Sequence, residues 1–444
     1  MKKWLAQYVG KDVEQTELFP LLFRGAGVAL ASQLLGAGIS YFTQVLLARW
    51  MGATDYGTYD YIIAIATLVG YVAGLGLPNS MLRFIPEYTV KQDWGRLKGL
   101  ILSSWGVVLL SSLLLAVVGS TTVAWLSQIS SLPSDSIKFG LWTVPLLALV
   151  RQQLEMTRAS KQIALAYLPS AVFLPLLVIF GSAYYGQELT SKLALIITMV
   201  SLAVVIIAQL WCFKVWFEKK CHAIKSIYVP KEWLAVAFPL LLNDGAHMIL
   251  SQTDILMIGS TLGSFQVGIY TAALKTSAWV GFILVAVNAI AAPMFATLYT
   301  QGRLKDLQEL VANIARWLFF PALLIAIALI INADAVLGLF GEEFVAGRWE
   351  MTVLIAGQLV NVGAGPVGYI MQMTGYHRQC AYVVCCSAFL NLILNSILIP
   401  MIGILGAAIA TAITMALWNI WLHQLVVKKI GVQPSIISAF KLGR

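Results

Sequence analysis

Four polar residues recur along one apolar stretch of the sequence, at Asp244, His247, Ser251 and Asp254. At about 100° per residue of an α-helix, they fall within an arc of roughly 80° and form one polar face. Such a face can line a wet cavity, where Asp244 or Asp254 would bind a coupling proton or sodium ion. It can equally supply hydrogen bonds between neighbouring helices, and both hypotheses stay open.

A further charged residue, Lys275, also lies within an apolar stretch. The turn before this stretch centres on Ser264 and Phe265, and Asp254 and Lys275 each lie about ten residues from that turn. In an antiparallel helical hairpin rising about 1.5 Å per residue, the two side chains would lie at the same depth. They could form a buried ion pair there, or Lys275 could contact an anionic substrate.

Five arginines lie near the ends of apolar stretches, and a guanidinium group matches the oxygens of a diphosphate in a bidentate way. They are Arg24, Arg83, Arg151, Arg158 and Arg316. Arg24 and Arg151 are the preferred candidates, because each borders a span that has no nearby compensating acid except Glu155. The alternative is that these arginines set the topology or bind lipid phosphates without specificity.

Amide side chains within the apolar stretches can contact sugar hydroxyls or join neighbouring helices. They are Asn288, Gln358, Asn361, Gln372, Asn391 and Asn395. Asn288 and Asn361 join Arg24, Arg83, Arg151 and Lys275 as the candidate substrate-binding residues. No spacing of metal ligands is present in the sequence, so no metal or organic cofactor is expected apart from the coupling ion.

The composition indicates which elements position these residues. Hydrophobic residues make up 59% of the chain and charged residues 11%, with a mean hydropathy of +0.83, whereas globular proteins carry roughly a quarter charged residues. The apolar stretches reach the about 20 residues needed to cross a bilayer, and a bilayer requires that they be helices. The connecting segments are short and lack a phosphate loop or a nucleophile motif. We therefore expect an all-α integral membrane protein that is a transporter and not an enzyme.

Twelve membrane spans are predicted. The charged stretch 218–231 separates an N-lobe (24–217) from a C-lobe (232–430), each with six helices, and two tails (1–23, lying on the membrane surface, and 431–444) flank them. The spans lie near 24–48, 57–82, 99–126, 137–157, 163–185, 192–216, 233–259, 267–292, 308–332, 350–373, 379–400 and 403–427.

One sequence pattern occurs twice, as MGATDYGTY at residues 51–59 and LGSFQVGIY at residues 262–270, at an offset of 211. Residues 86–98 also match 293–305, and TRASKQ (157–162) matches TGYHRQ (374–379). Internal duplication is typical of secondary transporters. An even number of spans in each copy predicts a pseudo-two-fold axis along the membrane normal.

The basic residues are distributed unevenly over the predicted loops. One side of the membrane holds 24 of the 29 Lys and Arg residues, together with both termini. Because cytoplasmic loops carry an excess of Lys and Arg, both termini are predicted to be cytoplasmic. The net charge of +9 reflects this bias, so no nucleic-acid partner is expected.

Three segments resemble a known family: residues 46–88, residues 253–275, and LNLILNSILIPMIGILGAAIATAI at residues 390–413. They are similar to the polysaccharide transporters, the oligosaccharide (O-antigen-type) flippases of the MOP exporter superfamily. The resemblance implies two six-helix lobes arranged as a V around a cationic central cavity. It also implies alternating access, often coupled to a proton or sodium gradient.

The same resemblance implies a flippase that moves undecaprenyl-diphosphate-linked oligosaccharide repeat units across the bacterial cytoplasmic membrane. Its expected partners are the lipid-linked oligosaccharide and membrane lipids, and the candidate partners are a polysaccharide polymerase and chain-length machinery. One alternative is a cation-coupled multidrug or metabolite antiporter of the same superfamily, with Asp244 or Asp254 as its ion carboxylate. Another is a membrane-embedded glycan polymerase.

Overall fold

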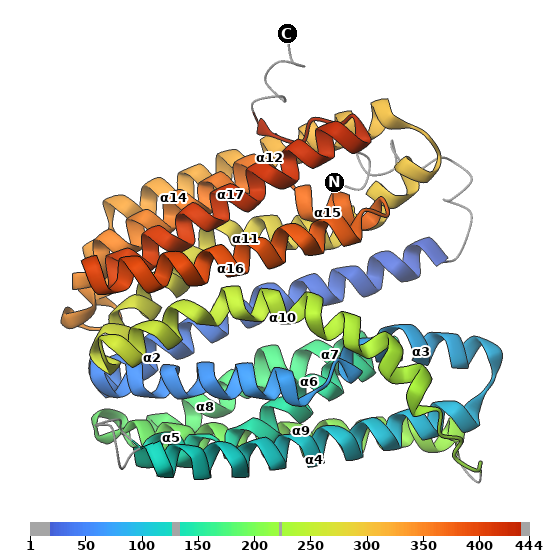
Figure 1. Cartoon of the computed structure of the whole chain (residues 1–444), viewed down its shortest axis with the longest axis horizontal. Coiled ribbons are helices and arrows are strands. Elements are labelled where there is room, and N and C mark those ends of the chain that lie inside the picture. The colour runs from blue at the N-terminus through green and yellow to red at the C-terminus, as the bar shows by residue number, and fades with distance from the viewer. Residues whose placement is uncertain (1–17, 127–133, 222–223, 437–444) are drawn as a thin grey trace. The chain divides into compact units, whose positions relative to one another are not determined.

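The computed structural model describes residues 18–126, 134–221 and 224–436, and these residues are almost wholly helical and contain no strand (Figure 1). The prediction of an all-α protein is confirmed. The chain forms two compact units. The N-unit comprises residues 32–268, and the C-unit comprises residues 269–444 with residues 1–31. Most of the predicted tail 1–23 lies outside the described residues, and its last part, from Leu18, belongs to a helix.

The N-unit is built from helices of very different lengths, some of them broken within a predicted span. Predicted span 137–157 is divided between two helices, and span 163–185 contains a π-helical turn at Pro169. The elements are α2 (Leu18–Ala73, with residues 32–73 in this unit), α3 (Leu77–Lys91), α4 (Trp94–Leu126), α5 (Ser134–Gly140), α6 (Thr143–Ala159), α7 (Ile163–Leu168), η1 (Pro169–Phe173), α8 (Leu174–Ala183), η2 (Gly186–Glu188), α9 (Ser191–Cys221) and α10 (Pro230–Thr261).

Helix α2 contains a break that separates two predicted spans. Its 56 residues would extend about 84 Å, far beyond a hydrocarbon core of about 30 Å. At Gly52 the backbone leaves the helical region, with φ 73° and ψ 171°. The residue that the duplication aligns with it, Gly263, also has a positive φ, of 91°, and joins α10 to α11 (Ser264–Thr300). Both copies of the repeated pattern therefore use a glycine in a conformation that other residues avoid.

The two copies of the pattern also pack against each other within the N-unit. A Cβ placed on Gly57 would lie 1.8 Å from the carbonyl oxygen of Ser264, and one on Gly268 would lie 2.2 Å from that of Ala53. Ser264 and Gly268 are the counterparts of Ala53 and Gly57 at the offset of 211. The contact is thus reciprocal, and only glycine allows the two backbones to approach so closely.

Helix α10 lies antiparallel along α2 and α3, in part through small residues. Gly259 contacts the ring of Tyr61, and a Cβ on Gly76 would lie 2.0 Å from the carbonyl oxygen of Ala237. At its first turns, α10 is anchored by Trp233, whose buried Nε1 donates a hydrogen bond of 3.0 Å to the hydroxyl of Tyr88. Trp233 and Tyr88 belong to an apolar cluster drawn from α3, α4, α6, α9 and α10. This packing fixes the helices that surround the candidate site described below.

In the C-unit, α17 packs closely against both α14 and α16 (Figure 1). Helices α14 and α15 meet at a bend of 42°, where Gly365 and Pro366 interrupt them. Residues 431–436 follow α17 and contact α12. Besides α11, the elements are α12 (Leu304–Ile331), α13 (Ala333–Gly338), η3 (Glu342–Gly347), α14 (Arg348–Ala364), α15 (Val367–Met373), α16 (His377–Ile402) and α17 (Ile404–Ile430).

Large apolar side chains remain exposed along the long helices, as in Leu110 of α4 (71% exposed) and Leu324 of α12 (69%). Such surfaces are expected where helices face lipid. By length and composition, seven described helices can cross a membrane, or up to ten if each bent pair counts as one span. The predicted number of twelve is not confirmed. One reason is that α6, with 17 residues, is too short to count as a span alone.

Candidate functional site

Arg151 lies in the middle of α6, where α2, α6 and α10 meet within the N-unit. Its guanidinium carbon lies 4.3 Å from the ring centroid of Tyr71 on α2. On α10, a Cβ at Gly245 would lie 3.9 Å from Cε1 of the same ring. Tyr71 is buried and Arg151 is half-buried. The aromatic ring thus lies against the cation, and Arg151 as a residue stays partly accessible.

The two amide side chains that follow Arg151 fix the orientation of α6 about its own axis. Nε2 of Gln152 donates a hydrogen bond of 3.3 Å to the sulfur of Met81 on α3. Nε2 of Gln153 donates one of 3.2 Å to the carbonyl oxygen of Ile206 on α9. Both amides are fully buried. Neighbouring helices therefore hold both residues, and this packing positions the side chain of Arg151.

Among the residues that the structure describes, no carboxylate pairs with Arg151. The nearest acid in sequence, Glu155, accepts hydrogen bonds of 2.8 and 2.9 Å from Nη1 of Arg158. A cation–π contact contributes about 0.5–2 kcal/mol, whereas removing a guanidinium from water costs several kcal/mol. Tyr71 alone cannot offset that cost. Because no described carboxylate offsets the rest of that cost, we expect Arg151 to contact water or an anion.

Replacing Arg158 by alanine is expected to destabilise the protein by about 1–2 kcal/mol, because the buried carboxylate of Glu155 loses the two hydrogen bonds that Arg158 donates. The effect is modest because the side chain of Arg158 is 36% exposed, so water already screens the pair. The measurement is the thermal unfolding midpoint in detergent. The double variant Glu155→Gln/Arg158→Gln should recover most of the loss, and a midpoint for Arg158→Ala equal to that of the wild type would contradict the pairing.

The predicted polar face of α10 changes its exposure along the helix. His247 and Ser251 are exposed, whereas Asp254 is buried, with 3% exposed. The side chain of Asp244 lies outside those that the structure describes. Lys275 is half-buried on α11, in the C-unit. The predicted Asp254–Lys275 pair joins residues of different units and stays a prediction.

Two predicted amides take part in the polar interior of the C-unit. Asn361 on α14 accepts a hydrogen bond of 3.0 Å from Asn419 on α17, and its own amide donates one of 3.4 Å to Gln358. Asn288 on α11 is buried, and its Oδ1 receives no hydrogen bond from the described residues. Asn361 thus joins two helices, while Asn288 retains an unused acceptor that could take a donor from a polar ligand.

The remaining predicted arginines lie in different surroundings from Arg151. Arg83 is exposed on α3 and lies 3.9 Å from the carboxylate of Glu87, so the structure does not bring it to the ring of Tyr71. Arg24 belongs to α2, but its side chain lies outside those described. Arg316 is half-buried on α12 and lines a pocket of the C-unit. In the described residues, no three His, Cys, Asp or Glu side chains gather to hold a metal ion.

Sequence reasoning missed two members of these sites, Tyr71 and Asn419. Asn419 lies within predicted span 403–427, so the criterion that selected Asn395 would also have selected it. Tyr71 carries no such signal, because an aromatic residue in a span usually only packs. Its role depends on the fold bringing α2 beside α6, which is visible only in the structure.

The chain matches two protein-family models. Residues 22–299 match the model described as polysaccharide biosynthesis protein, which covers more than half of the chain. Residues 239–397 match the MatE model. The first match includes α2 to α10, and with them Arg151 and Tyr71. The second includes most of α10 with Asp254.

Two curated relatives are archaeal. The chain is 29% identical over 178 residues to a protein of Haloferax volcanii named as a probable low-salt glycan biosynthesis flippase. That alignment covers 39% of this chain and 37% of the relative, so this chain matches well under half of that relative's length. An uncharacterized membrane protein of Methanocaldococcus jannaschii is 23% identical over 401 residues, which cover 87% of this chain and 93% of the relative.

Solved structures show the same fold at low identity. The lipid II flippase MurJ in an inward closed conformation has a TM-score of 0.69 and 15% identity, over 89% of this chain and 86% of that one. A MOP superfamily transporter from Pyrococcus furiosus has a TM-score of 0.67 and 12% identity, over 92% and 95%. These proteins are membrane transporters. By its apolar helices and its family match, the chain is a multi-pass membrane protein that belongs to the polysaccharide biosynthesis protein family.

Proposed function

We propose that this protein is a flippase that carries an undecaprenyl-diphosphate-linked oligosaccharide repeat unit from the inner to the outer leaflet of a bacterial cytoplasmic membrane. The family match, and a relative named as a probable glycan biosynthesis flippase, support this substrate class. The observation that carries the proposal is Arg151. It is a half-buried guanidinium within a helical membrane unit, held by Tyr71 and paired with no described carboxylate.

Arg151 suits a diphosphate because of its charge and its shape. The guanidinium stays protonated and presents parallel N–H donors to two phosphate oxygens. The guanidinium carbon lies 4.3 Å from the centroid of the Tyr71 ring. We infer that the diphosphate binds to the N–H donors of this guanidinium. Arg24 and Arg83 would attract the anion at the cytoplasmic mouth, and both termini would be cytoplasmic.

The glycan and the polyprenyl chain need different surroundings during transfer. Sugar hydroxyls require hydrogen-bonding groups, and we assign Asn288 and Asn361 to them, while the polyprenyl chain would remain in lipid. Asn288 supports this assignment through its unused acceptor. Alternating access would then expose the headgroup to the other side, coupled to a proton or sodium ion at Asp244 or Asp254. A polysaccharide polymerase and chain-length machinery would use the product.

The test is a translocation assay with purified protein in sealed vesicles. Fluorescent undecaprenyl-diphosphate-linked oligosaccharide is placed in one leaflet, and a membrane-impermeant enzyme or quencher reports its arrival in the other. We expect transfer that requires the protein and leaves the substrate chemically unchanged. Longer glycan products would indicate a polymerase, and an absence of transfer above protein-free vesicles would contradict the proposal. A parallel assay with another polyprenyl carrier tests the lipid, since both curated relatives are archaeal.

Replacing Lys275 by alanine is expected to reduce translocation by about tenfold if its ammonium contacts the diphosphate, because one charge-assisted hydrogen bond contributes about 1.5–3 kcal/mol. The initial rate of transfer in vesicles is the measurement, with the amount of folded protein matched by size-exclusion chromatography. If Lys275→Ala transports at the wild-type rate, the residue does not lie on the substrate path. If Lys275→Ala does not fold and the double variant Asp254→Asn/Lys275→Ala does fold, Asp254 and Lys275 form a structural ion pair.

A second candidate function is a cation-coupled antiporter for drugs or metabolites. The observation that favours it is the MatE match, which includes the buried carboxyl of Asp254. A buried carboxylate in a membrane helix is suited to exchange a proton or bind sodium. Binding to the purified protein separates the two functions. Saturable binding of organic cations without binding of lipid-linked sugar would favour the antiporter.

A further inference from the structure

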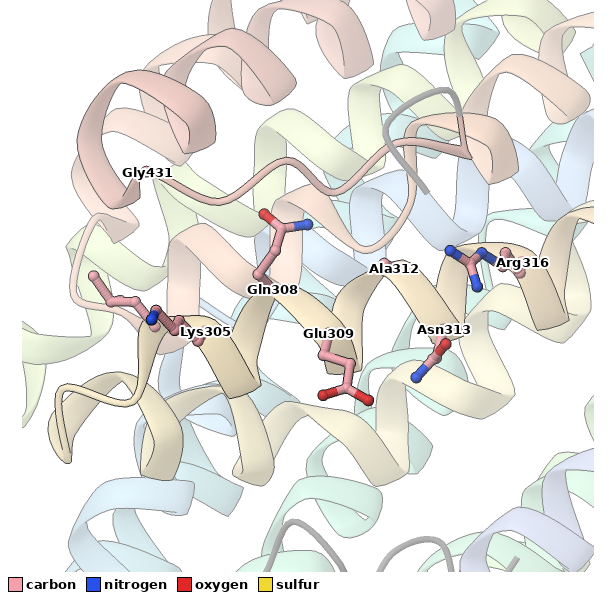
Figure 2. A pocket seen from close by; sticks show the side chains of 8 residues that line it. Lys305, Gln308, Glu309, Ala312, Asn313, Arg316 and Gly431 are labelled. Carbon is pink, nitrogen blue, oxygen red and sulfur yellow. The ribbon is translucent and has the colours of Figure 1, made fainter. Parts of the chain in front are cut away.

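A pocket of about 570 Å³ opens on α12 in the C-unit, and the function proposed above does not use it. It is lined by Leu304, Lys305, Gln308, Glu309, Ala312, Asn313 and Arg316 of α12 and by Gly431 (Figure 2). The α12 residues recur every three or four positions, so they share one side of the helix. The volume lies within the range of small-molecule sites, about 300–1,000 Å³.

Gly431 lines this pocket, and the segment 431–436 that it begins is held against α12. Helix α17 ends at Gly431, which adopts the left-handed conformation with φ 78°. Gln433 then donates its backbone N–H to Oε1 of Gln308 at 2.6 Å and accepts a hydrogen bond of 3.0 Å from Nε2 of the same side chain. Ile436 packs on Ala312 and Phe319. Two hydrogen bonds and an apolar contact thus hold this segment against α12.

The polar groups of the pocket divide into cations and hydroxyl-binding groups. Lys305 and Arg316 lie at its two ends, about 16 Å apart along the helix axis. Between them Gln308 points toward the side where residues 431–436 run, and Glu309 and Asn313 point toward the other side (Figure 2). Lys428 and Lys429, in the last turn of α17, add positive charge beside Gly431. Cations favour a phosphate, while carboxylate and amide groups favour hydroxyls.

The pocket ends where the lipid-facing part of α12 begins. Directly after Arg316, Trp317 is 55% exposed, and Phe320, Leu324 and Ile327 continue the exposed apolar surface. Aromatic residues concentrate at the level of lipid headgroups, and Lys and Arg extend toward that level. The pocket thus lies at the headgroup level of one leaflet, where lipid is abundant.

We propose that this pocket binds the headgroup of an anionic membrane lipid that carries hydroxyls, of the phosphatidylglycerol type. The phosphodiester lies against Arg316, next to the apolar surface that takes the acyl chains. The glycerol hydroxyls hydrogen-bond to Glu309 and Asn313. A bare phosphate monoester is disfavoured because it would meet the carboxylate of Glu309. This inference does not depend on the transported substrate, because it concerns a lipid that stays in its leaflet.

The test is lipid binding to the purified full-length protein, measured by native mass spectrometry after titration with phosphatidylglycerol, phosphatidic acid or phosphatidylcholine. We expect the Kd of the wild type for phosphatidylglycerol to be at least about tenfold lower than its Kd for phosphatidylcholine. Arg316→Gln should weaken the binding of phosphatidylglycerol by about tenfold, since the change removes the charged hydrogen-bond donors. Glu309→Gln should instead strengthen the binding of phosphatidic acid. The difference in affinity between phosphatidic acid and phosphatidylglycerol should then become smaller.

Arg378→Gln is the matched control, because Arg378 is an exposed arginine in the first turn of α16 and does not line the pocket. Lys305→Gln is the second variant, since its exposed side chain can be replaced without disturbing folding. The proposal is overturned if both pocket variants bind phosphatidylglycerol as the wild type does. It is also overturned if phosphatidylcholine binds with the same affinity as phosphatidylglycerol. Displacement of phosphatidylglycerol by an equal concentration of lipid-linked oligosaccharide would overturn it as well.

Discussion

Replacing Gly57 by alanine is expected to lower the yield of folded protein sharply, with a destabilisation of about 3 kcal/mol. The added Cβ would lie 1.8 Å from the carbonyl oxygen of Ser264 and 2.6 Å from the backbone nitrogen of Gly268. No side chain can move aside to relieve this overlap, because both partners are backbone atoms. The two copies of the repeated pattern would have to separate, and the packing around them would be lost. The measurement is the monodisperse fraction and the thermal unfolding midpoint in detergent.

Gly38→Ala is the matched control for this prediction. Gly38 lies in the same helix, and a Cβ there would meet no atom within 4 Å. Alanine at an unobstructed helical position is expected to be neutral or slightly stabilising. Gly57→Ala combined with Gly268→Ala should cost less than the sum of the single changes, because one separation of the backbones relieves both overlaps. Equal midpoints for Gly57→Ala and Gly38→Ala would show that the close contact does not contribute to stability.

The glycines of this contact could be anticipated from the sequence, because the repeated pattern places them at equivalent positions. The offset of 211 aligned Gly52 with Gly263 and Gly57 with Gly268, and the structure gives the first pair the same unusual conformation. The sequence did not reveal that the copies would contact each other. Hydropathy identifies which segments enter a bilayer, but not which two helices approach most closely.

The number of spans was less predictable for a physical reason. Hydropathy counts apolar stretches, whereas a span also requires an uninterrupted hydrogen-bonded helix of sufficient length. Predicted span 137–157 is divided between α5 and α6, and its second part carries Arg151, Glu155 and Arg158. A helix buried among its neighbours can be short and charged, since protein rather than lipid surrounds it.

The arginines show where the sequence stops being informative. Arg83 lies four residues before Glu87, and a helical pair is readable from that spacing alone. Glu155, however, is four residues after Arg151 and three before Arg158, so either arginine could have taken it. The structure pairs it with Arg158. Tertiary packing of Arg151 against Tyr71 decides between them, and no local pattern encodes it.

Replacing Arg151 by glutamine is expected to reduce translocation of lipid-linked oligosaccharide by about 10- to 100-fold, which corresponds to the loss of charged hydrogen bonds of about 1.5–3 kcal/mol. Arg151→Lys should fall between the wild type and Arg151→Gln, because lysine keeps the charge but lacks the planar fork that engages two phosphate oxygens. The protein itself should not be destabilised by either change, since no described carboxylate depends on Arg151. The measurements are the initial transfer rate in vesicles and the Kd for the lipid-linked sugar.

Arg96→Gln separates this site-specific effect from a general effect of charge. Arg96 belongs to the same unit, but its side chain is 41% exposed and pairs with Asp93 at 3.4 Å, whereas Arg151 pairs with no described carboxylate. Its replacement removes one positive charge and should leave the transfer rate within about twofold of the wild type, because exposed pairs contribute little. If Arg96→Gln and Arg151→Gln slow transfer equally, net charge rather than the Arg151 site controls it. If Arg151→Gln transports normally while remaining folded, the diphosphate binds elsewhere and Arg151 does not lie on the substrate path.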